Sequence, residues 1–189
     1  MDALIALLKS DANAANAFGA LASAAAALLA LLVSAVSVGI SVWAVRSERR
    51  HNALSVRPLA EITVADYEAS LRVKLRNHGT GPMIITAVIV SDGSSTRPTI
   101  LDWMPDLPNE RPWANFTGEI RDRALAPGSE IVLLELTEYE DEIGFAECRN
   151  IVRAALAPLT VNVEYTNIYN TIMPLRRKEL SWFGRHSEA

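Results

Sequence analysis

The stretch Leu75–Val90, LRNHGTGPMIITAVIV, contains the residues whose spacing comes closest to that of a ligand-binding loop. A glycine loop that binds phosphate leads into a helix, whose first backbone amides hold the anion. Here Asn77, Gly79, Gly81 and Pro82 are followed by β-branched residues, and no Lys-Ser or Lys-Thr pair follows the glycines. We therefore predict a hairpin connection between two strands, in which the glycines supply positive φ angles.

The other residues that could do chemistry are scattered. The single cysteine, Cys148, has no histidine near it in the sequence, and the three histidines are solitary: His51, His78 and His186. The sequence has no G-x-S-x-G, H-E-x-x-H or C-x-x-C motif. An acidic run, Glu138–Glu142, does not match the spacing of an EF-hand loop. We assign no catalytic residue, metal ligand or cofactor, and predict that the protein is not an enzyme.

The composition of the chain limits which kinds of partner and how many domains it can have. The chain has 189 residues, a formal net charge of -4 and a pI of about 5.4. It has no overall basic character that would hold nucleic acid, so we predict no nucleic-acid partner. Half of the residues are hydrophobic and the mean hydropathy is +0.14, with much of the apolar character in the first quarter of the chain. This length allows one globular domain plus an appendage.

The appendage is predicted to be a transmembrane helix. No charged residue lies between Asp11 and Arg46, and the apolar centre is Leu21–Trp43. A helix needs only about 20 apolar residues to cross a bilayer. The stretch is too long, and its N-terminal flank too acidic, for a cleaved signal peptide. We predict an N-terminal tail and helix start over residues 1–20 and a membrane span over 21–45.

The flanks of the span predict its orientation. Four basic residues follow it, namely Arg46, Arg49, Arg50 and Arg57, whereas only Lys9 precedes it. The positive-inside rule then places the N-terminus outside and the C-terminal part in the cytoplasm. We expect Trp43, Arg46, Arg49 and Arg50 to contact lipid headgroups, and residues 46–53 to form a basic juxtamembrane linker.

One face of the span carries small and hydroxylated side chains. They are Gly19, Ser23, Ala27, Ala30, Ser34, Ser37 and Ser41. Such a stripe allows two helix backbones to approach closely in lipid, which predicts self-association through this seam. The alternative is that an alanine-rich helix places small residues on every face.

From residue 54 onward the pattern is that of strands. In LRVKLR, Leu71, Val73 and Leu75 alternate with basic residues, and MIITAVIV (83–90) is apolar on both faces, as in a central strand. We predict further strands over 54–64, 130–138 and 159–167, and six or seven in all. A helix is predicted near 143–155, after a capping box of Thr137 and Glu140.

These elements predict a mainly β domain over residues 54–183, followed by a tail over 184–189. Short strands with turn signals favour an antiparallel, Ig-like β-sandwich with one short helix, and a small β-barrel is the alternative. The segment Leu101–Ile120 holds Trp103, Trp113 and Phe116 in a long loop with three prolines. Such a loop is a candidate partner-binding site. Alternatively, both indoles cap the end of the sandwich.

Three motifs together resemble a pattern found in uncharacterised bacterial membrane proteins with an N-terminal span and an Ig-like domain. The matching residues are Arg57, Pro58, Asn77, Gly79, Gly81, Pro82, Tyr165, Asn167 and Tyr169. The resemblance implies this fold and a setting in the bacterial inner membrane. It implies no activity and no catalytic residue.

Two functional hypotheses follow. In the first, the protein is a non-enzymatic single-pass anchor whose cytoplasmic domain binds a protein partner within an oligomeric assembly. In the second, it is a membrane effector, in which the β-domain senses a signal and clustered helices perturb the bilayer. Membrane-anchored β-domains of some bacterial antiviral defence systems have this layout, so the second hypothesis rests on architecture alone.

Overall fold

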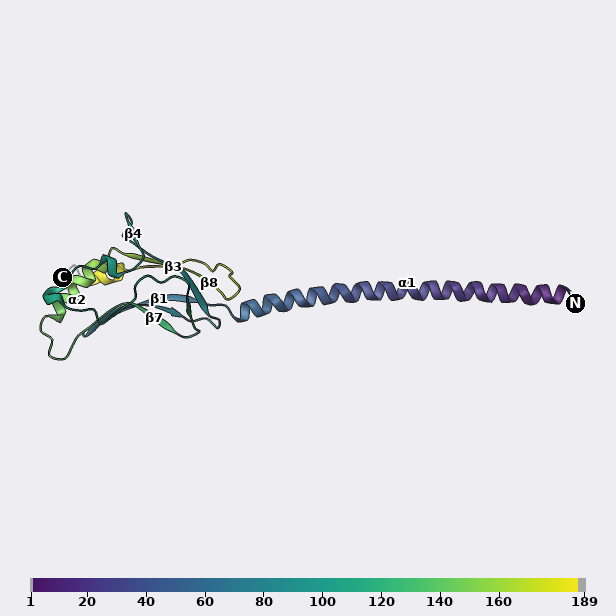
Figure 1. Ribbon diagram of the computed structural model, residues 1–189, viewed down its shortest axis with the longest axis horizontal. Coiled ribbons are helices and arrows are strands. Elements are labelled where there is room, and N and C mark those ends of the chain that lie inside the picture. The colour runs from purple at the N-terminus through teal and green to yellow at the C-terminus, as the bar shows by residue number, and fades with distance from the viewer. Residues whose placement is uncertain (1, 187–189) are drawn as a thin grey trace. The chain divides into compact units, whose positions relative to one another are not determined.

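The computed structural model describes residues 2–186 and separates the chain into two units, Met1–Asn52 and Ala53–Ala189. The long helix α1 covers Asp2–Ser55 (Figure 1). Its part Asp11–Asn52 is long and apolar enough to cross a membrane, and none of its most apolar window is buried. The helix continues through residues 46–53, so the predicted linker is helical.

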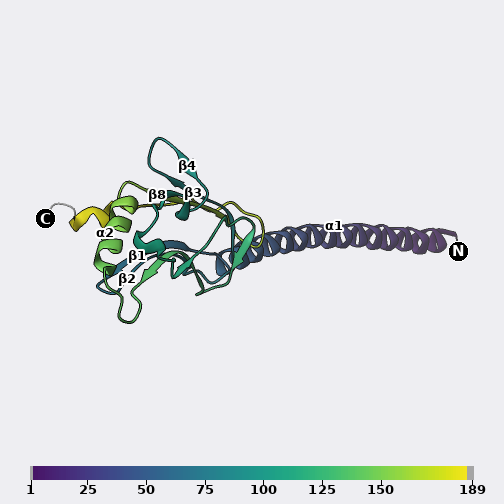
Figure 2. The ribbon, with the colours of Figure 1, turned by 60° about the vertical axis from the view of Figure 1, so that its left-hand side comes forward.

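The second unit contains two antiparallel sheets (Figures 1 and 2). In the described residues the strands are β1 (Ala60–Tyr67), β2 (Ser70–Asn77), β3 (Met83–Ser91), β4 (Thr96–Arg97), β5 (Asn115–Phe116), β6 (Arg123–Leu125), β7 (Glu130–Thr137), β8 (Thr160–Thr166) and β9 (Arg176–Glu179). The helical elements are α2 (Phe145–Leu156) and three short 3-10 helices, η1 (Leu101–Trp103), η2 (Pro108–Glu110) and η3 (Ser181–His186).

The four-stranded sheet has the order β1-β2-β7-β5, and the five-stranded sheet has the order β4-β3-β8-β9, with β6 also paired to β3. Side chains from both sheets and from α2 form one hydrophobic core. The alternation predicted for β2 is confirmed, because Leu71, Val73 and Leu75 are fully buried between more exposed residues. The prediction of a central strand is also confirmed, since β3 pairs with β8 on one side and with β4 and β6 on the other.

The prediction of a hairpin at Asn77–Pro82 is wrong. β2 belongs to the four-stranded sheet and β3 to the five-stranded sheet, so the turn passes from one sheet to the other. Gly79 and Gly81 are also absent from the residues with positive φ angles. A Cβ atom on Gly79 would overlap the backbone of residues 57–59, and one on Gly81 would overlap the carbonyl of Val56. The glycines are therefore required by the close approach of two backbone segments.

Two further local predictions are wrong. The first strand of the domain begins at Ala60 and not at residue 54, because α1 continues to Ser55. The capping box is not formed, since Thr137 ends β7 and α2 begins after Gly144 with no side-chain cap. Instead, residues 138–144 form a turn, and Glu142 in this turn accepts a hydrogen bond from the backbone N–H of Tyr139.

The domain has two distinct ends. We call the end formed by residues 56–59 and the turns 77–82, 126–129 and 167–175 the linker end, because the chain reaches it directly from α1. Register places these turns together: β3 starts beside the end of β8, with Ile84 opposite Thr166. The other end holds the turn 138–144, α2 and η3, and we call it the α2 end. In Figures 1 and 2, α2 and the loop that follows β8 lie at opposite ends of the domain.

Candidate functional site

The segment that carries the predicted partner-binding loop is folded onto the α2 end. Ile100 and Leu107 are almost fully buried and fix the segment to the core. Residues 101–103 and 108–110 form short 3-10 helices, and β5 adds a two-residue strand at the edge of the four-stranded sheet. Asn109 and Glu110 both have positive φ angles, so the chain turns sharply just before Arg111.

Arg111 joins this segment to the turn 138–144. Its guanidinium donates hydrogen bonds to both carboxylate oxygens of Glu142, through Nε to Oε1 and through Nη2 to Oε2 at 2.9 Å, and from Nη2 to the carbonyl of Thr137 at 2.6 Å. The Arg111 side chain is only 6% exposed. The hydrogen bond from Arg111 lowers the pKa of Glu142 below its ordinary value, and the same bond raises the pKa of Arg111.

The same guanidinium lies near two aromatic rings. Its central carbon is 5.0 Å from the centre of the Tyr139 ring and 5.4 Å from that of Phe145. Both distances are within the range of cation–π attraction. Arg111 is therefore a structural anchor whose charge is neutralised by Glu142, and it is not a free cation for a ligand.

Two grooves lie on either side of Arg111. One has a volume of about 600 Å³ and is lined by Leu101, Met104, Pro105, Asp106, Leu107, Glu110, Arg111, Trp113 and Phe116. The other has a volume of about 470 Å³ and is lined by Pro108, Asn109, Arg111, Pro112, Tyr139, Glu142, Ile143, Gly144, Glu147 and Cys148. We call the two grooves together the Arg111 surface.

The predicted loop residues divide between this surface and the core. Trp113 and Phe116 line the larger groove, and Phe116 is 48% exposed. Trp103 does not line it. Its ring packs partly against the core and is covered by the Arg97 guanidinium, 4.7 Å from the ring centre.

Sequence reasoning missed the second groove. Ile143 is 96% exposed and Tyr139 is 46% exposed, although both lie in a turn that was interpreted as the start of a helix. The sequence carried no signal for this groove, because a single apolar residue in an exposed turn is common.

The Arg111 surface combines these apolar side chains with an acidic rim. Asp106 and Glu110 line the larger groove and Glu147 the smaller one. The structure gives these three carboxylates no ion pair within the residues that it describes. The arrangement can bind an apolar side chain flanked by positive charge.

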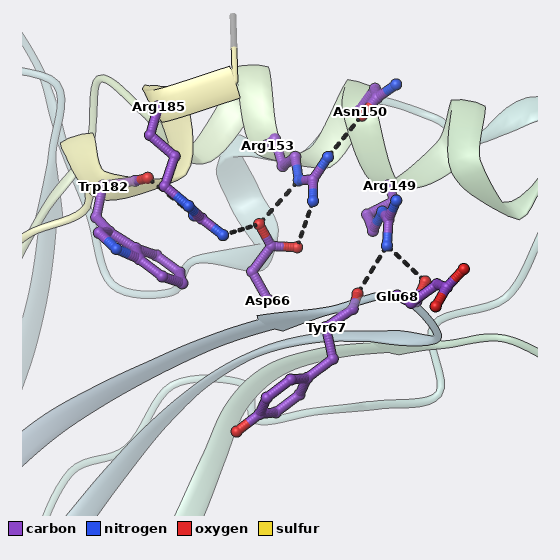
Figure 3. A network of polar contacts seen from close by, with 8 residues as sticks. All are labelled: Asp66, Tyr67, Glu68, Arg149, Asn150, Arg153, Trp182 and Arg185. Carbon is purple, nitrogen blue, oxygen red and sulfur yellow. Dashed lines mark hydrogen bonds and ion pairs between the residues drawn. The ribbon is translucent and has the colours of Figure 1, made fainter.

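A second charged cluster lies beneath α2 (Figure 3). Asp66, at the end of β1, has a fully buried side chain. Its carboxylate accepts hydrogen bonds from Arg153 Nε and Nη2 at 2.9 and 2.8 Å and from Arg185 Nη2 at 2.8 Å. The guanidinium of Arg185 stacks on Trp182. Each carboxylate oxygen is occupied by a donor, so Asp66 clamps α2 and η3 to the sheet.

The glycine-rich turn at the linker end is closed to a phosphate. The Asn77 side chain is buried, and its Oδ1 accepts hydrogen bonds from the N–H groups of Leu59 and Gly79 at 3.1 and 2.9 Å. Its Nδ2 donates to the carbonyls of Gly81 and Leu125. The N–H groups of His78 and Thr80 donate to residues 59 and 57. The amides that would hold an anion are therefore used within the fold.

No set of three His, Cys, Asp or Glu side chains that could hold a metal ion occurs among the described residues. Cys148 is buried, and His78 lies 2.8 Å from the Glu61 carboxylate. The placement of the His186 side chain lies outside the described part.

The predicted seam and headgroup residues all lie on α1, where every residue from Asn16 to Asn52 is exposed. The hydroxyls of Ser37 and Ser41 donate to the carbonyls of Val33 and Ser37, each at 2.8 Å. These two hydroxyls therefore have partners within their own helix, and a helix–helix seam would depend chiefly on their small size.

Protein-family models contain no match to this chain, and a search of curated proteins also finds none.

Proposed function

We propose that the protein is a non-enzymatic, single-pass protein of the bacterial inner membrane whose cytoplasmic domain binds a protein partner through the Arg111 surface. The observation that carries the proposal is the unburied apolar length of α1. Side chains such as Leu28, Leu32 and Val36 are more than half exposed. Each large apolar side chain left in water forgoes about 1.5–3 kcal/mol, and a bilayer removes this penalty.

The orientation follows from the basic residues after the span. Arg46, Arg49 and Arg50 are exposed on α1, and this excess over Lys9 favours a cytoplasmic domain. Alkaline phosphatase fused after Ala189 should be inactive, and a fluorescent protein at the same site should fluoresce. An active phosphatase fusion would contradict the orientation.

We interpret the two sheets as an Ig-like sandwich. Both sheets contribute to one core, and the described strands contain no hydrogen-bonded pair that joins the sheets into a closed barrel. Such a domain presents loops and edge strands at its ends, which is where partners of many sandwich domains bind.

The partner is inferred from the chemistry of the Arg111 surface. Exposed Ile143, Phe116 and Tyr139 supply apolar anchors, while Asp106, Glu110 and Glu147 supply negative charge. A protein segment with an apolar side chain beside Lys or Arg is complementary to this arrangement.

A photoreactive residue at position 116 or 143 of the full-length protein should crosslink one partner in living cells. A label at Ser94, in an exposed turn, is the matched control. The crosslinks should disappear when Glu110 and Glu147 are replaced by Lys. Equal crosslinking at all three positions would refute a specific site.

Self-association through the seam of α1 remains a prediction and gives the anchor its oligomeric form. Replacing Ser34 and Ser37 with Leu should reduce cysteine crosslinking along the seam, whereas Leu29→Ile and Val36→Ile should not. Growth arrest that requires the span would instead favour the membrane-effector hypothesis.

A further inference from the structure

The loop after β8 exposes an unusual amount of apolar surface. Ile168, Tyr169, Ile172 and Leu175 are 45%, 56%, 84% and 53% exposed. No charged residue occurs between Glu164 and Arg176. An exposed, uncharged cluster of this kind marks an interaction surface in a soluble environment.

The loop is folded, so this exposure belongs to the native structure. Asn167 is 3% exposed, and its Oδ1 accepts hydrogen bonds from the N–H groups of Tyr169 and Thr171, both at 2.9 Å. The N–H of Asn167 donates to the carbonyl of Thr171 at 3.2 Å, and that of Met173 donates to Tyr165 at 3.0 Å. With its polar groups bonded internally, the turn holds Ile172 outward.

The loop belongs to the linker end. Thr166 pairs with Ile84 and bridges to Ile172, and Ile84 follows directly on the glycine-rich turn. In that turn, the Thr80 hydroxyl donates to the carbonyl of Ser55, the last residue of α1. Ser55 is ten positions beyond Val45, and at 1.5 Å per helical residue this is a rise of about 15 Å at most. The polar region of one leaflet accounts for roughly 5–8 Å of that distance.

The charged residues next to the loop indicate what binds to this surface. Arg176, Arg177 and Lys178 follow the apolar loop directly, in β9. Arg177 pairs with Glu179 at the end of the same strand, and Glu164 lines a groove with Ile172 and Leu175, so Arg176 and Lys178 supply the positive charge. Tyrosine and aliphatic side chains beside a row of cations are typical of segments that bind the interface of an anionic membrane. The acidic rim of the Arg111 surface, at the other end of the domain, would be repelled by the same lipids.

We propose that the loop Asn167–Leu175 is a second membrane contact, in which Ile168, Tyr169, Ile172 and Leu175 enter the lipid interface and the cations of β9 meet anionic headgroups. This inference rests on the proposed membrane anchoring. It gives the protein two contacts with the bilayer, the helix and the loop.

The test uses the full-length protein in vesicles of phosphatidylethanolamine and phosphatidylglycerol. In a Cys148→Ala background, a single cysteine replaces Ile172 or, as the control, Ser94, and each is labelled with an environment-sensitive fluorophore. A nitroxide attached to the lipid headgroup should quench the label at 172 several-fold more than the label at 94. Phosphatidylcholine vesicles should weaken the effect, since they carry no net negative charge.

A second pair of variants tests whether the loop, and not the fluorophore itself, contacts the membrane. With the label at Tyr169, the double substitution Ile172→Glu and Leu175→Glu should abolish quenching, whereas Ile143→Glu should leave it unchanged. All the labelled proteins should keep the same melting temperature, because the substituted side chains are exposed.

Different results would contradict the membrane anchoring and the second membrane contact. Extraction of the chain by alkaline carbonate would refute the membrane anchoring itself. A chain that stays in the membrane with an unquenched label at 172 would overturn only the second contact. Crosslinking of position 172 to another copy or to another protein, in place of quenching, would identify the loop as a protein interface and would also overturn it.

Discussion

The two ends of the domain are held by different kinds of interaction. At the linker end, two buried asparagines, Asn77 and Asn167, tie the turns together through neutral hydrogen bonds to the backbone, and the ion pairs there, Lys74–Glu130 and His78–Glu61, are partly exposed. At the α2 end, ion pairs join the segments. Asp66 pairs with Arg153 and Arg185, and Arg111 pairs with Glu142. Neutral amide networks do not titrate, whereas carboxylate–guanidinium pairs respond to pH.

This difference matches the surroundings proposed for each end. A surface near lipid headgroups experiences the membrane's charge and benefits from few carboxylates, so uncharged turns suit the linker end. A surface that recognises a soluble partner gains specificity from charge, which suits the acidic rim at the α2 end.

The largest effect is expected at Gly81. A single methyl group there overlaps the carbonyl of Val56, and no side-chain rotation can relieve an overlap between backbone and Cβ. Gly81→Ala should therefore cost at least about 5 kcal/mol of the free energy of unfolding, which approaches the whole stability of a small domain. Urea denaturation followed by circular dichroism measures the change.

The control for this variant is Gly93, which has a φ of 95° and open space around the position of a Cβ atom. Gly93→Ala should cost only about 1–2 kcal/mol, from the positive φ angle. If the two variants lose equal stability, then close approach is not the reason for Gly81.

The second largest effect is expected at Asp66. Asp66→Asn removes the charge that neutralises Arg153, whose side chain is 13% exposed. Breaking a buried ion pair from one side costs about 3–5 kcal/mol, because an uncompensated charge is left behind. The matched control is Glu179→Gln, since Glu179 and its partner Arg177 are both 63% exposed and such pairs contribute about 0–1 kcal/mol. Similar losses for both variants in urea denaturation would argue against the clamp.

Sequence patterns anticipated the parts of this structure that depend on local periodicity. The alternation in β2 and the continuous apolar run of β3 were sufficient to identify both strands. The apolar length of α1 was visible in the same way. Each of these signals depends on residues within one element.

The errors concern contacts between distant segments. Nothing near Gly81 in the sequence indicates that Val56 will lie against it, so its role was assigned to a positive φ angle. Likewise, nothing near Glu142 in the sequence indicates that its partner is Arg111, which lies 31 residues away. Of the residues that line the Arg111 surface, Trp113 and Phe116 belong to the predicted candidate partner-binding loop, whereas Ile143 was placed in a helix.

The ion pair between Glu142 and Arg111 should make part of the stability of the α2 end depend on pH. In the folded protein the pKa of Glu142 lies below its ordinary value of 4.5, mainly because of the hydrogen bond from Arg111. A lowered folded-state pKa means that the unfolded chain binds the proton more readily. The contribution of Glu142 to stability is therefore complete above pH 4.5 and is lost as the pH falls through its folded pKa.

Glu142→Gln should be less stable than the wild type at neutral pH, and this difference should shrink in acid. The hydrogen bond from Lys74 also lowers the pKa of Glu130, so the Glu142→Gln variant should keep part of the acid sensitivity of the wild type. Asn77→Ala, at the linker end, should lower stability by the same amount at every pH. Thermal melts between neutral and acidic pH check all three, and a pH-dependent loss in Asn77→Ala would contradict the assignment of neutral bonding to that end.

The smallest effect on stability is expected from the two most exposed isoleucines, one at each end. Ile172 is 84% exposed and Ile143 is 96% exposed, so neither loses core packing when it is replaced by Gln. Each substitution should change the free energy of unfolding by less than about 0.5 kcal/mol. Their functional effects should nevertheless differ.

Ile172→Gln should weaken the quenching of a label at position 169 by the headgroup nitroxide. It should leave the partner crosslink at position 116 intact, because the loop is proposed to face lipid. Ile143→Gln should do the reverse, because it removes an apolar anchor from the Arg111 surface. If either variant impaired both readouts, the two ends would form one continuous interaction surface, and the division between a neutral membrane-facing end and a charged partner-binding end would be wrong.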